Sequence, residues 1–306
     1  MRPGDLVRLL LLAAIWGGSF LLMRIVAPAI GPIIAAEARV SIAAIALSVW
    51  LAVQGTRMEW EKNWLALVIV GVTNSAIPFA AFAYAALTLP AGYSAILNAT
   101  APLFSALLAA VWLSDRLTLR KLAGLGFGIA GVALLVRLGP LGFSAPVARA
   151  LGAALCGAFS YAVASTYVKT LAHPVPSPVM ATGSQWTAAA VLLPLTPFVP
   201  LAAPPSPLLL AGIVTLGVVC TALGYLLYFR LIRDVGPIKA LTVTFLIPMF
   251  ALAWGRIALG EAVTARMLAG AALVIVATWL VLATPRAGSA RDSARLKRAA
   301  ELPDAR

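Results

Sequence analysis

Residues that could perform acid–base, nucleophilic or metal chemistry are sparse in this sequence. Of its ten acidic residues, only Glu37 falls within a long apolar run, so no pair of carboxylates is available there for proton transfer. The single histidine, His173, stands beside a proline in a polar break, and Cys156 and Cys220 form no CxxC motif. Neither a nucleophile with its base nor a set of metal ligands can be assembled. The sequence therefore predicts a protein that is not an enzyme and that uses no metal and no cofactor.

Uncharged polar and aromatic side chains inside the apolar runs are better candidates, because they can bind a solute. Thr221, Tyr225 and Tyr228 recur at helical spacing on one face of such a run. A polar side chain that faces lipid is costly, so these residues should face other helices or a wet cavity. Small hydroxyl residues are also ordinary packing contacts between membrane helices, and for Ser and Thr this alternative stays open. We expect a cavity lined by Trp16, Phe20, Asn74, Phe79, Asn98, Tyr161, Gln185, Trp186, Thr221, Tyr225 and Thr244.

Two ionisable residues, Glu37 and Arg39, lie within the second apolar run, where a charge is a functional candidate by default. Residues two positions apart on a helix point to different sides, and both are expected in the outer half of the membrane, near Arg24. Two interpretations stay open: a structural ion pair that anchors the first and second helices, or a role in gating or coupling.

Pro102 and Pro248 occupy matched positions in the fourth and ninth apolar runs. A proline inside a helix removes a backbone donor and leaves a carbonyl free. We expect each proline to act as a hinge or to present a carbonyl to the substrate, with a tolerated kink as the alternative.

The elements that must position these residues are membrane-spanning helices. Hydrophobic residues make up 62% of the 306 residues and charged residues 11%, whereas soluble domains are about half apolar and a quarter charged. Unclosed strands would leave backbone groups unpaired in lipid, so the spans must be helical. The sequence predicts an all-α integral membrane protein with ten transmembrane helices. Their expected ranges are 8–27, 33–54, 64–86, 92–112, 121–138, 149–168, 178–198, 207–229, 237–257 and 265–283.

The distribution of Lys and Arg predicts how the chain is oriented. If the N-terminus is cytoplasmic, 17 of the 23 Lys and Arg residues lie on the cytoplasmic side. Both termini are therefore expected in the cytoplasm, and residues 286–306 are expected to form a basic cytoplasmic tail. The formal charge of +13 follows from this orientation and does not indicate nucleic-acid binding.

One stretch of the sequence occurs twice. Residues 102–124 align with residues 248–270 at a constant shift of 146, with eight identities in 23 positions and Asp115 opposite Glu261. We expect a first five-helix repeat in residues 1–140 and a second in residues 141–285. Because five is an odd number, the second repeat enters the membrane inverted, which is an arrangement typical of transporters with a central cavity. At the two matched loops, a carboxylate is expected to cap the following helix.

Motifs along the chain resemble the drug/metabolite transporter superfamily, EamA type. They are the Trp16-Gly17-Gly18-Ser19-Phe20 run, Arg39, the matched prolines, and the Leu259-Gly260-Glu261, Thr264, Gly270 pattern. In the first copy Ser114-Asp115 stands where the family usually has Gly-Glu. The resemblance implies a ten-helix carrier in the bacterial inner membrane, commonly an exporter of amino acids, related metabolites or drugs.

The positions of the charged residues restrict the classes of substrate that we expect. No Lys or Arg is expected near the centre of a span, so multiply charged solutes such as sugar phosphates are poor candidates. Aromatic and hydrophobic amino acids suit a cavity of aromatic and amide side chains, and flat cationic drugs are the alternative. The expected partners are a small-molecule substrate and the lipid bilayer, with no nucleic acid and no obligate protein partner. A membrane enzyme with an unrecognised site is the remaining alternative.

Overall fold

The computed structural model describes residues 2–138, 144–199 and 206–283, and within these ranges every regular element is a helix. The first half of the chain contains α1 (Pro3–Ile30), α2 (Pro32–Val53), α3 (Trp60–Gly71), the π-helix η1 (Val72–Ala76), α4 (Ile77–Ala85), α5 (Ala91–Asn98), α6 (Ala101–Trp112) and α7 (Leu119–Leu138). The second half contains α8 (Ala145–Val168), α9 (Ser177–Leu192), the 3₁₀-helix η2 (Leu193–Phe198), α10 (Pro207–Gly217), the π-helix η3 (Val218–Leu223), α11 (Gly224–Val235), α12 (Pro237–Ala240), α13 (Val243–Leu259) and α14 (Ala265–Leu282). The predicted basic tail, residues 286–306, lies outside the described residues.

Several of these helices have the length and composition needed to cross a bilayer. Within the described residues seven segments qualify: Pro3–Ile30, Pro32–Val53, Trp60–Ala85, Ala91–Trp112, Ala145–Val168, Pro207–Val235 and Ala265–Leu282. No more than half of each apolar segment is buried inside the molecule, and large apolar side chains such as Val111 and Trp279 face outward. An apolar outer surface of this extent suits lipid rather than water. The protein is a multi-pass membrane protein.

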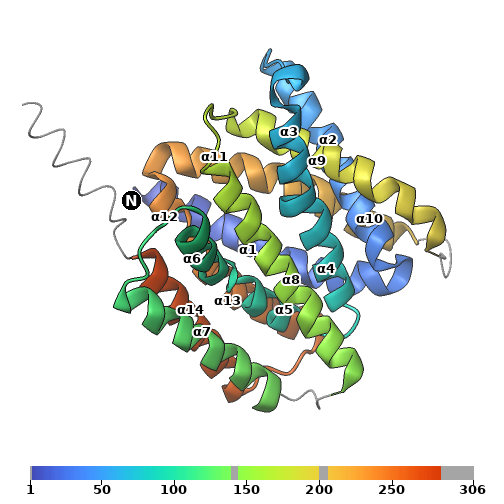
Figure 1. The fold of residues 1–306 in the computed structure, drawn as a ribbon. Helices are drawn as coiled ribbons and strands as arrows, with labels where there is room; N and C mark the ends of the chain where they lie inside the picture. Colours follow the sequence, from blue (N-terminus) through green and yellow to red (C-terminus); the bar gives the residue numbers. More distant parts are fainter. Residues whose placement is uncertain (1, 139–143, 200–205, 284–306) are drawn as a thin grey trace, which may run out of the picture.

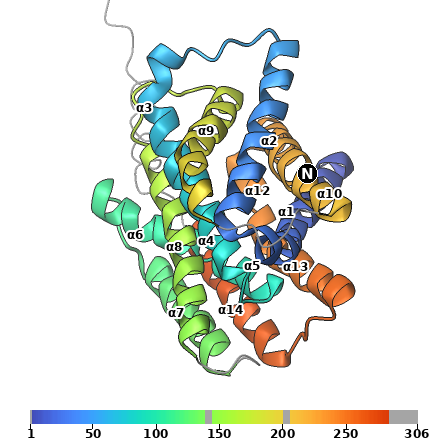
Figure 2. The same cartoon turned by 90° about the vertical axis from the view of Figure 1, so that its right-hand side faces the viewer.

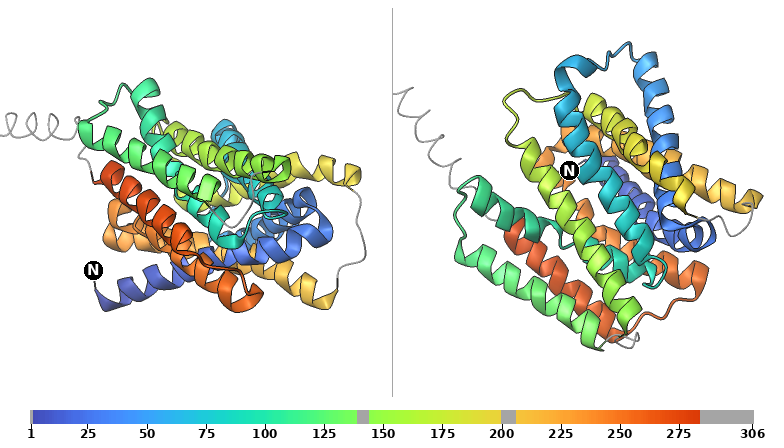
Figure 3. Two further views of the ribbon diagram at one scale, coloured as in Figure 1. Left: turned by 90° about the horizontal axis from the view of Figure 1, so that it is seen from below. Right: turned by 45° about the vertical axis from the view of Figure 1, so that its right-hand side comes forward.

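Two groups of helices lie at opposite ends of the molecule, and the remaining helices lie between them (Figure 1). α7 and α14 lie side by side at the lower left of Figure 1, and the view from below in Figure 3 shows the same pairing. α2, α3, α9 and α10 gather at the opposite end, where α2 packs along α9 (Figure 2).

Glycines permit the close approach of α7 and α14. A Cβ atom added to Gly124 would lie 2.8 Å from the carbonyl oxygen of Ala277, and one added to Gly270 would lie 3.1 Å from the carbonyl oxygen of Gly131. These two contacts correspond to each other, because a shift of 146 converts Gly124 into Gly270 and Gly131 into Ala277. The contact is therefore made twice, with the two helices exchanging roles.

Other local features recur at the same shift. Thr118 and Thr264 each accept a hydrogen bond from a backbone N–H three residues later, at the start of α7 and α14. The backbone N–H groups of Asp115 and Glu261 each donate over 3.1 Å to a carbonyl six residues earlier. The hydroxyls of Thr118 and Thr264, rather than the carboxylates of Asp115 and Glu261, therefore accept the hydrogen bonds at the starts of α7 and α14.

Two predicted spans pass through a π-helical turn near their middle. η1 joins α3 to α4, and η3 joins α10 to α11. Such turns are rare, and they often occur at functional sites because they redirect side chains. Within η3, the Thr221 hydroxyl donates to the Leu216 carbonyl over 2.8 Å and so satisfies a carbonyl five residues earlier. The turns place Asn74 and Ser75 in one segment and Thr221 in the other.

Two further predicted spans are each divided into two helices: 92–112 into α5 and α6, and 237–257 into α12 and α13. The two matched prolines therefore lie in different local settings. Pro102 lies in the first turn of α6, where its missing N–H removes no helical hydrogen bond. Pro248 is buried inside α13, where the Thr244 carbonyl loses its usual donor. Pro248 therefore lies in a helix interior, whereas Pro102 lies just after the break between α5 and α6, and both stay candidate hinges.

Candidate functional site: a polar cluster between the two halves

Arg39 lies at the centre of a polar cluster between the two halves of the chain. Its Nε–H donates to Thr221 Oγ1 in η3 over 2.8 Å, and its guanidinium carbon lies 3.9 Å from the centroid of the Phe79 ring. The Arg39 side chain is only 6% exposed. Thr221 is the midpoint of the continuous segment Pro207–Val235, so a cation is placed level with the middle of a membrane-spanning segment. The expectation that no basic residue lies near the centre of a span is wrong.

The predicted ion pair that would anchor the first and second helices does not form, because neither Glu37 nor Arg39 has an ion-pair partner among the described residues. Glu37 instead accepts a hydrogen bond from the Ser41 hydroxyl over 2.6 Å, one turn further along α2. Among the described residues no carboxylate lies within 4.0 Å of Arg39. The two-residue spacing explains this, since it turns Arg39 toward η3 and Glu37 to another side of the helix.

A second hydrogen bond matches the bond from Arg39 to Thr221, with the two halves of the chain exchanged. Gln185, which is fully buried in α9, donates from Nε2 to Ser75 Oγ in η1 over 2.8 Å. A shift of 146 converts Arg39 into Gln185 and Ser75 into Thr221. Each half therefore contributes one long polar side chain that reaches the π-helical turn of the other half.

Asn74 and Tyr225 cross-link the two π-helical regions. Asn74 Nδ2 donates to Tyr225 Oη over 3.0 Å, and Tyr225 Oη also interacts with the side chains of Ser75 and Gln185. The Tyr225 ring stacks on Phe229 with centroids 5.9 Å apart. Asn74 and Tyr225 are partly exposed, whereas Ser75 and Gln185 are buried, so the cluster extends from an accessible side to a closed one.

Aromatic side chains predicted to bind solute flank this cluster. Tyr161 on α8 stacks with Phe82 at 6.2 Å between centroids, and Phe20 on α1 meets the same ring edge-on at 5.6 Å. Trp16 on α1 lies 5.3 Å from the Tyr228 ring on α11. Phe20 is almost fully buried, so its packing against α4 accounts for its position.

Three predicted lining residues are not brought into the cluster. The Trp186 ring is 39% exposed, and its Nε1–H donates outward to Ser48 Oγ on α2. The Thr244 hydroxyl donates to the Leu241 carbonyl in its own chain segment. Asn98, the last residue of α5, makes no hydrogen bond to the cluster within the part of the chain that the structure describes.

Ser75 is not predicted to belong to the site from the sequence, because a serine in an apolar run is usually a packing residue. The repeat contained the necessary signal, since Ser75 is the position equivalent to Thr221. No cluster of three His, Cys, Asp or Glu side chains suitable for a metal occurs among the described residues.

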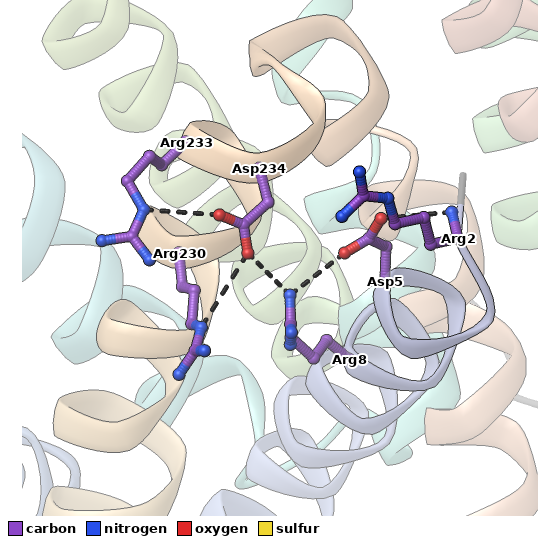
Figure 4. Close-up of polar contacts among 6 residues, drawn as sticks. All are labelled: Arg2, Asp5, Arg8, Arg230, Arg233 and Asp234. Atoms are coloured by element: carbon purple, nitrogen blue, oxygen red, sulfur yellow. Dashed lines mark hydrogen bonds and ion pairs between the residues drawn. The ribbon is translucent and has the colours of Figure 1, made fainter.

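The two ends of α1 carry ionic contacts that are not predicted from the sequence. Near its N-terminus, Arg8 bonds Asp5 at 3.0 Å and Asp234 of α11 at 2.7 Å, and Asp234 also pairs with Arg230 and Arg233 (Figure 4). This network joins the first turns of α1 to the last turn of α11.

At the other end of α1, Arg24 lies 3.8 Å from Glu261, and its Nη1 donates to the Ala86 carbonyl over 2.6 Å. Both carboxylate oxygens of Glu261 accept from the Ala91 N–H at the start of α5, at 3.0 and 3.2 Å. Burial raises the pKa of the Glu261 carboxyl, and the Ala91 N–H and the Arg24 charge oppose that rise. Glu261 therefore caps a helix of the other half.

A cavity of about 450 Å³ adjoins Glu261 and is lined by Arg24, Ile25, Pro28, Leu87, Leu259 and Glu261. None of the predicted solute-binding residues lines it. The polar cluster around Arg39, rather than this peripheral cavity, contains the side chains that could recognise a solute.

Comparison with known sequences decides the family. The pattern of the EamA-like transporter family matches twice, over residues 5–137 and 148–283. The chain belongs to the EamA-like transporter family. Membership is consistent with the drug/metabolite transporter superfamily, and it makes the protein a membrane transporter of small molecules rather than an enzyme.

Individual relatives of this transporter carry more specific names. The chain is 26% identical to a probable terminal-alkyne amino-acid exporter of Streptantibioticus cattleyicolor, over 89% of this chain and 91% of that protein. It is also 26% identical to a probable amino-acid metabolite efflux pump of Salmonella typhimurium, over 89% of this chain and 92% of that protein. A solved crystal structure with 18% identity and a TM-score of 0.63 covers 92% of this chain and 96% of its own, and it supports the fold alone.

Proposed function

We propose that the protein exports amino acids, with aromatic or hydrophobic ones favoured, across the bacterial inner membrane by alternating access. In this proposal ten helices form two inverted repeats, residues 1–140 and 141–285, and both termini are cytoplasmic. The observation that carries the proposal is the polar cluster of Arg39, Asn74, Gln185 and Tyr225 at the contact between the halves, in which Arg39 and Gln185 are buried. Two relatives named for amino-acid export support the choice of solute.

The reciprocal contacts support a two-fold relation between the halves. Contacts across a two-fold axis occur in pairs in which the partners exchange roles. Arg39 with Thr221 and Gln185 with Ser75 form one such pair, and the glycine contacts of α7 and α14 form another. Five helices in each half would place this axis in the membrane plane, which is the arrangement that lets one site open to either side.

The ionic contacts of α1 fit gates at the two membrane faces. A helix of 28 residues is about 42 Å long, so Arg8 and Arg24 lie near opposite faces. The Arg8 and Arg24 side chains are each 30% exposed in these pairs. Ion pairs that reach solvent contribute only about 0–1 kcal/mol each. Contacts of such modest strength can hold one face closed and yet separate in a transport cycle.

The buried cation at Arg39 favours amino acids over the alternative of cationic drugs. A positively charged solute at this cluster would meet a like charge in an environment of low dielectric, which is unfavourable. A solute with a carboxylate and an apolar side chain would instead match the cation and the neighbouring aromatic rings.

Solute counterflow tests the proposed function. Liposomes that contain the purified protein are loaded with unlabelled L-phenylalanine, and trace labelled L-phenylalanine is added outside. The expected result is transient accumulation of label inside, because a carrier exchanges solute without net flux. Protein-free liposomes and Tyr225→Ala protein serve as controls, and the variant should exchange more slowly because it loses a cluster side chain. Absence of exchange by folded wild-type protein, across a panel of amino acids, would contradict the proposal.

A further inference from the structure

We infer that Arg39 is the receptor for a carboxylate of the transported solute, which makes a free carboxylate a requirement for binding. This inference rests on the proposed transport of amino acids and identifies the residue that selects them. It would exclude amines and amides that share the solute's apolar side chain but lack its acid group.

The first argument is the unused hydrogen-bonding capacity of Arg39. A guanidinium group carries five N–H donors. Its Nε–H is used by Thr221, and within the described residues no acceptor takes the donors of the two terminal nitrogens. A buried cation without a counter-ion is costly, and arginines in such positions are normally paired. A carboxylate that arrives with the solute would supply both the negative charge and the missing acceptors.

The second argument is the geometry of the stack with Phe79. The phenyl ring covers one face of the guanidinium at 3.9 Å. The N–H donors point outward in the plane of the group, so stacking leaves them available. Ring contact and the Thr221 bond together hold the planar fork in one orientation. A fork held in this way can bind a carboxylate through two parallel hydrogen bonds.

The third argument comes from the equivalent position in the other half. Gln185 replaces the arginine there, and its Oε1 atom is buried and has no hydrogen-bond partner. The two equivalent positions therefore differ in charge, and each has polar atoms without a partner. A solute with a single carboxylate fits one strong anion position better than it fits a symmetric pair.

The fourth argument is access to the cluster. Asn74, Tyr161 and Tyr225 are partly exposed, whereas Arg39, Thr221 and Gln185 are buried. A solute that enters along the accessible side chains would place its carboxylate at the closed side, where low polarity strengthens the ionic hydrogen bonds.

Paired ligands that differ only at the carboxylate test this inference. The probes are L-phenylalanine with L-phenylalaninamide, and L-leucine with L-leucinamide. Their dissociation constants are measured on purified wild-type protein and on Arg39→Gln and Arg39→Lys variants. For wild type, we expect each acid to bind at least about tenfold more tightly than its amide, because loss of a buried charged hydrogen bond is costly. Arg39→Gln should remove this preference, and Arg39→Lys should retain part of it.

Trp186→Phe is the control. It removes the hydrogen bond from Trp186 Nε1 to Ser48, which lies outside the cluster, and keeps the guanidinium group and its contacts, so it should preserve the preference for acids. If Trp186→Phe abolishes the preference as fully as Arg39→Gln does, the loss reflects general destabilisation and Arg39 is not the carboxylate receptor. Equal binding of acid and amide by wild type contradicts this inference alone. Failure of wild type to bind any of the four probes contradicts the proposed function as well.

Discussion

Arg39 is buried and Glu261 is partly buried, and their surroundings differ in charge. Within the described residues Arg39 has a hydroxyl and an aromatic ring as neighbours and no carboxylate, whereas Glu261 has an arginine and a backbone N–H. A partner from outside the chain can therefore change the state of Arg39, and a proton can change the state of Glu261. The first is suited to binding a solute, and protonation of the second should change the stability of the folded protein.

The protonation of Glu261 should make the stability of the folded protein depend on pH. Burial raises its folded-state pKa above the usual value of 4.5, so the native state holds this proton more tightly than the unfolded chain does. The contribution of this group to stability therefore increases as pH falls from neutral toward that pKa. Glu261→Gln removes the buried charge and keeps an acceptor for the Ala91 N–H. We expect Glu261→Gln to match or exceed wild-type melting temperature at pH 7.5, and the difference to shrink by pH 5.

The control for this prediction is Asp115→Asn at the equivalent position of the first half. Its carboxylate pairs with Lys121 at 2.8 Å, so the variant should be less stable than wild type at pH 7.5. A loss of stability at pH 7.5 in Glu261→Gln as well would show that the Glu261 charge stabilises the folded protein.

At the scale of single residues, the sequence predicts which side chains belong to the site better than it predicts the residues that they contact. Asn74, Gln185 and Tyr225 are found because large polar side chains in apolar runs are costly unless they are satisfied. The partner of Arg39 is not found, since Thr221 lies 182 positions away and no local pattern links α2 to η3. Trp186 was expected inside because of its type, but a tryptophan at the surface of a membrane helix is equally compatible with the sequence.

At the scale of elements, the shapes of the helices depend on contacts between them. The runs of apolar residues predict where helices lie, because each must be long enough to cross lipid. The π-helical turns are not predicted, since their extra residue is stabilised by contacts such as the Thr221 bonds to Arg39 and to the Leu216 carbonyl. The break between α5 and α6 is likewise invisible in the apolar pattern, although Pro102 stands just after it.

Gly124 and Gly126 of α7 allow the effect of helix packing on stability to be measured apart from the effect of helix propensity. A Cβ atom on Gly124 would lie 2.8 Å from the Ala277 carbonyl and 2.9 Å from Val281, whereas one on Gly126 meets nothing within 4 Å. We expect Gly124→Ala to destabilise the protein by about 1–3 kcal/mol, because α14 must move away. Gly126→Ala should be neutral or slightly stabilising, by up to about 1 kcal/mol. Thermal unfolding in detergent measures both, and equal effects would show that α7 and α14 are not in close contact.

At the scale of the whole molecule, the account depends on two halves with opposite orientations. Contacts that recur at a shift of 146 link identical residues, such as Thr118 and Thr264, and different residues, such as Arg39 and Gln185. The sequence repeat predicts that two units exist, because residues 102–124 and 248–270 share eight identities. It does not predict the reciprocal contacts, which depend on how the units pack. In the proposed transport cycle, inversion of the second half would allow a single polar cluster to open to either membrane face.

Labelling of one matched pair of loop positions tests this claim most directly. Leu117 and Val263 are equivalent at the shift of 146, and both are exposed outside the helices. In a background with Cys156 and Cys220 replaced by alanine, Leu117→Cys and Val263→Cys are treated with a membrane-impermeant maleimide on intact cells. The account predicts labelling at position 263, and labelling at position 117 only after the cells are permeabilised. Labelling of both positions from the same side would contradict the inverted arrangement of the two halves.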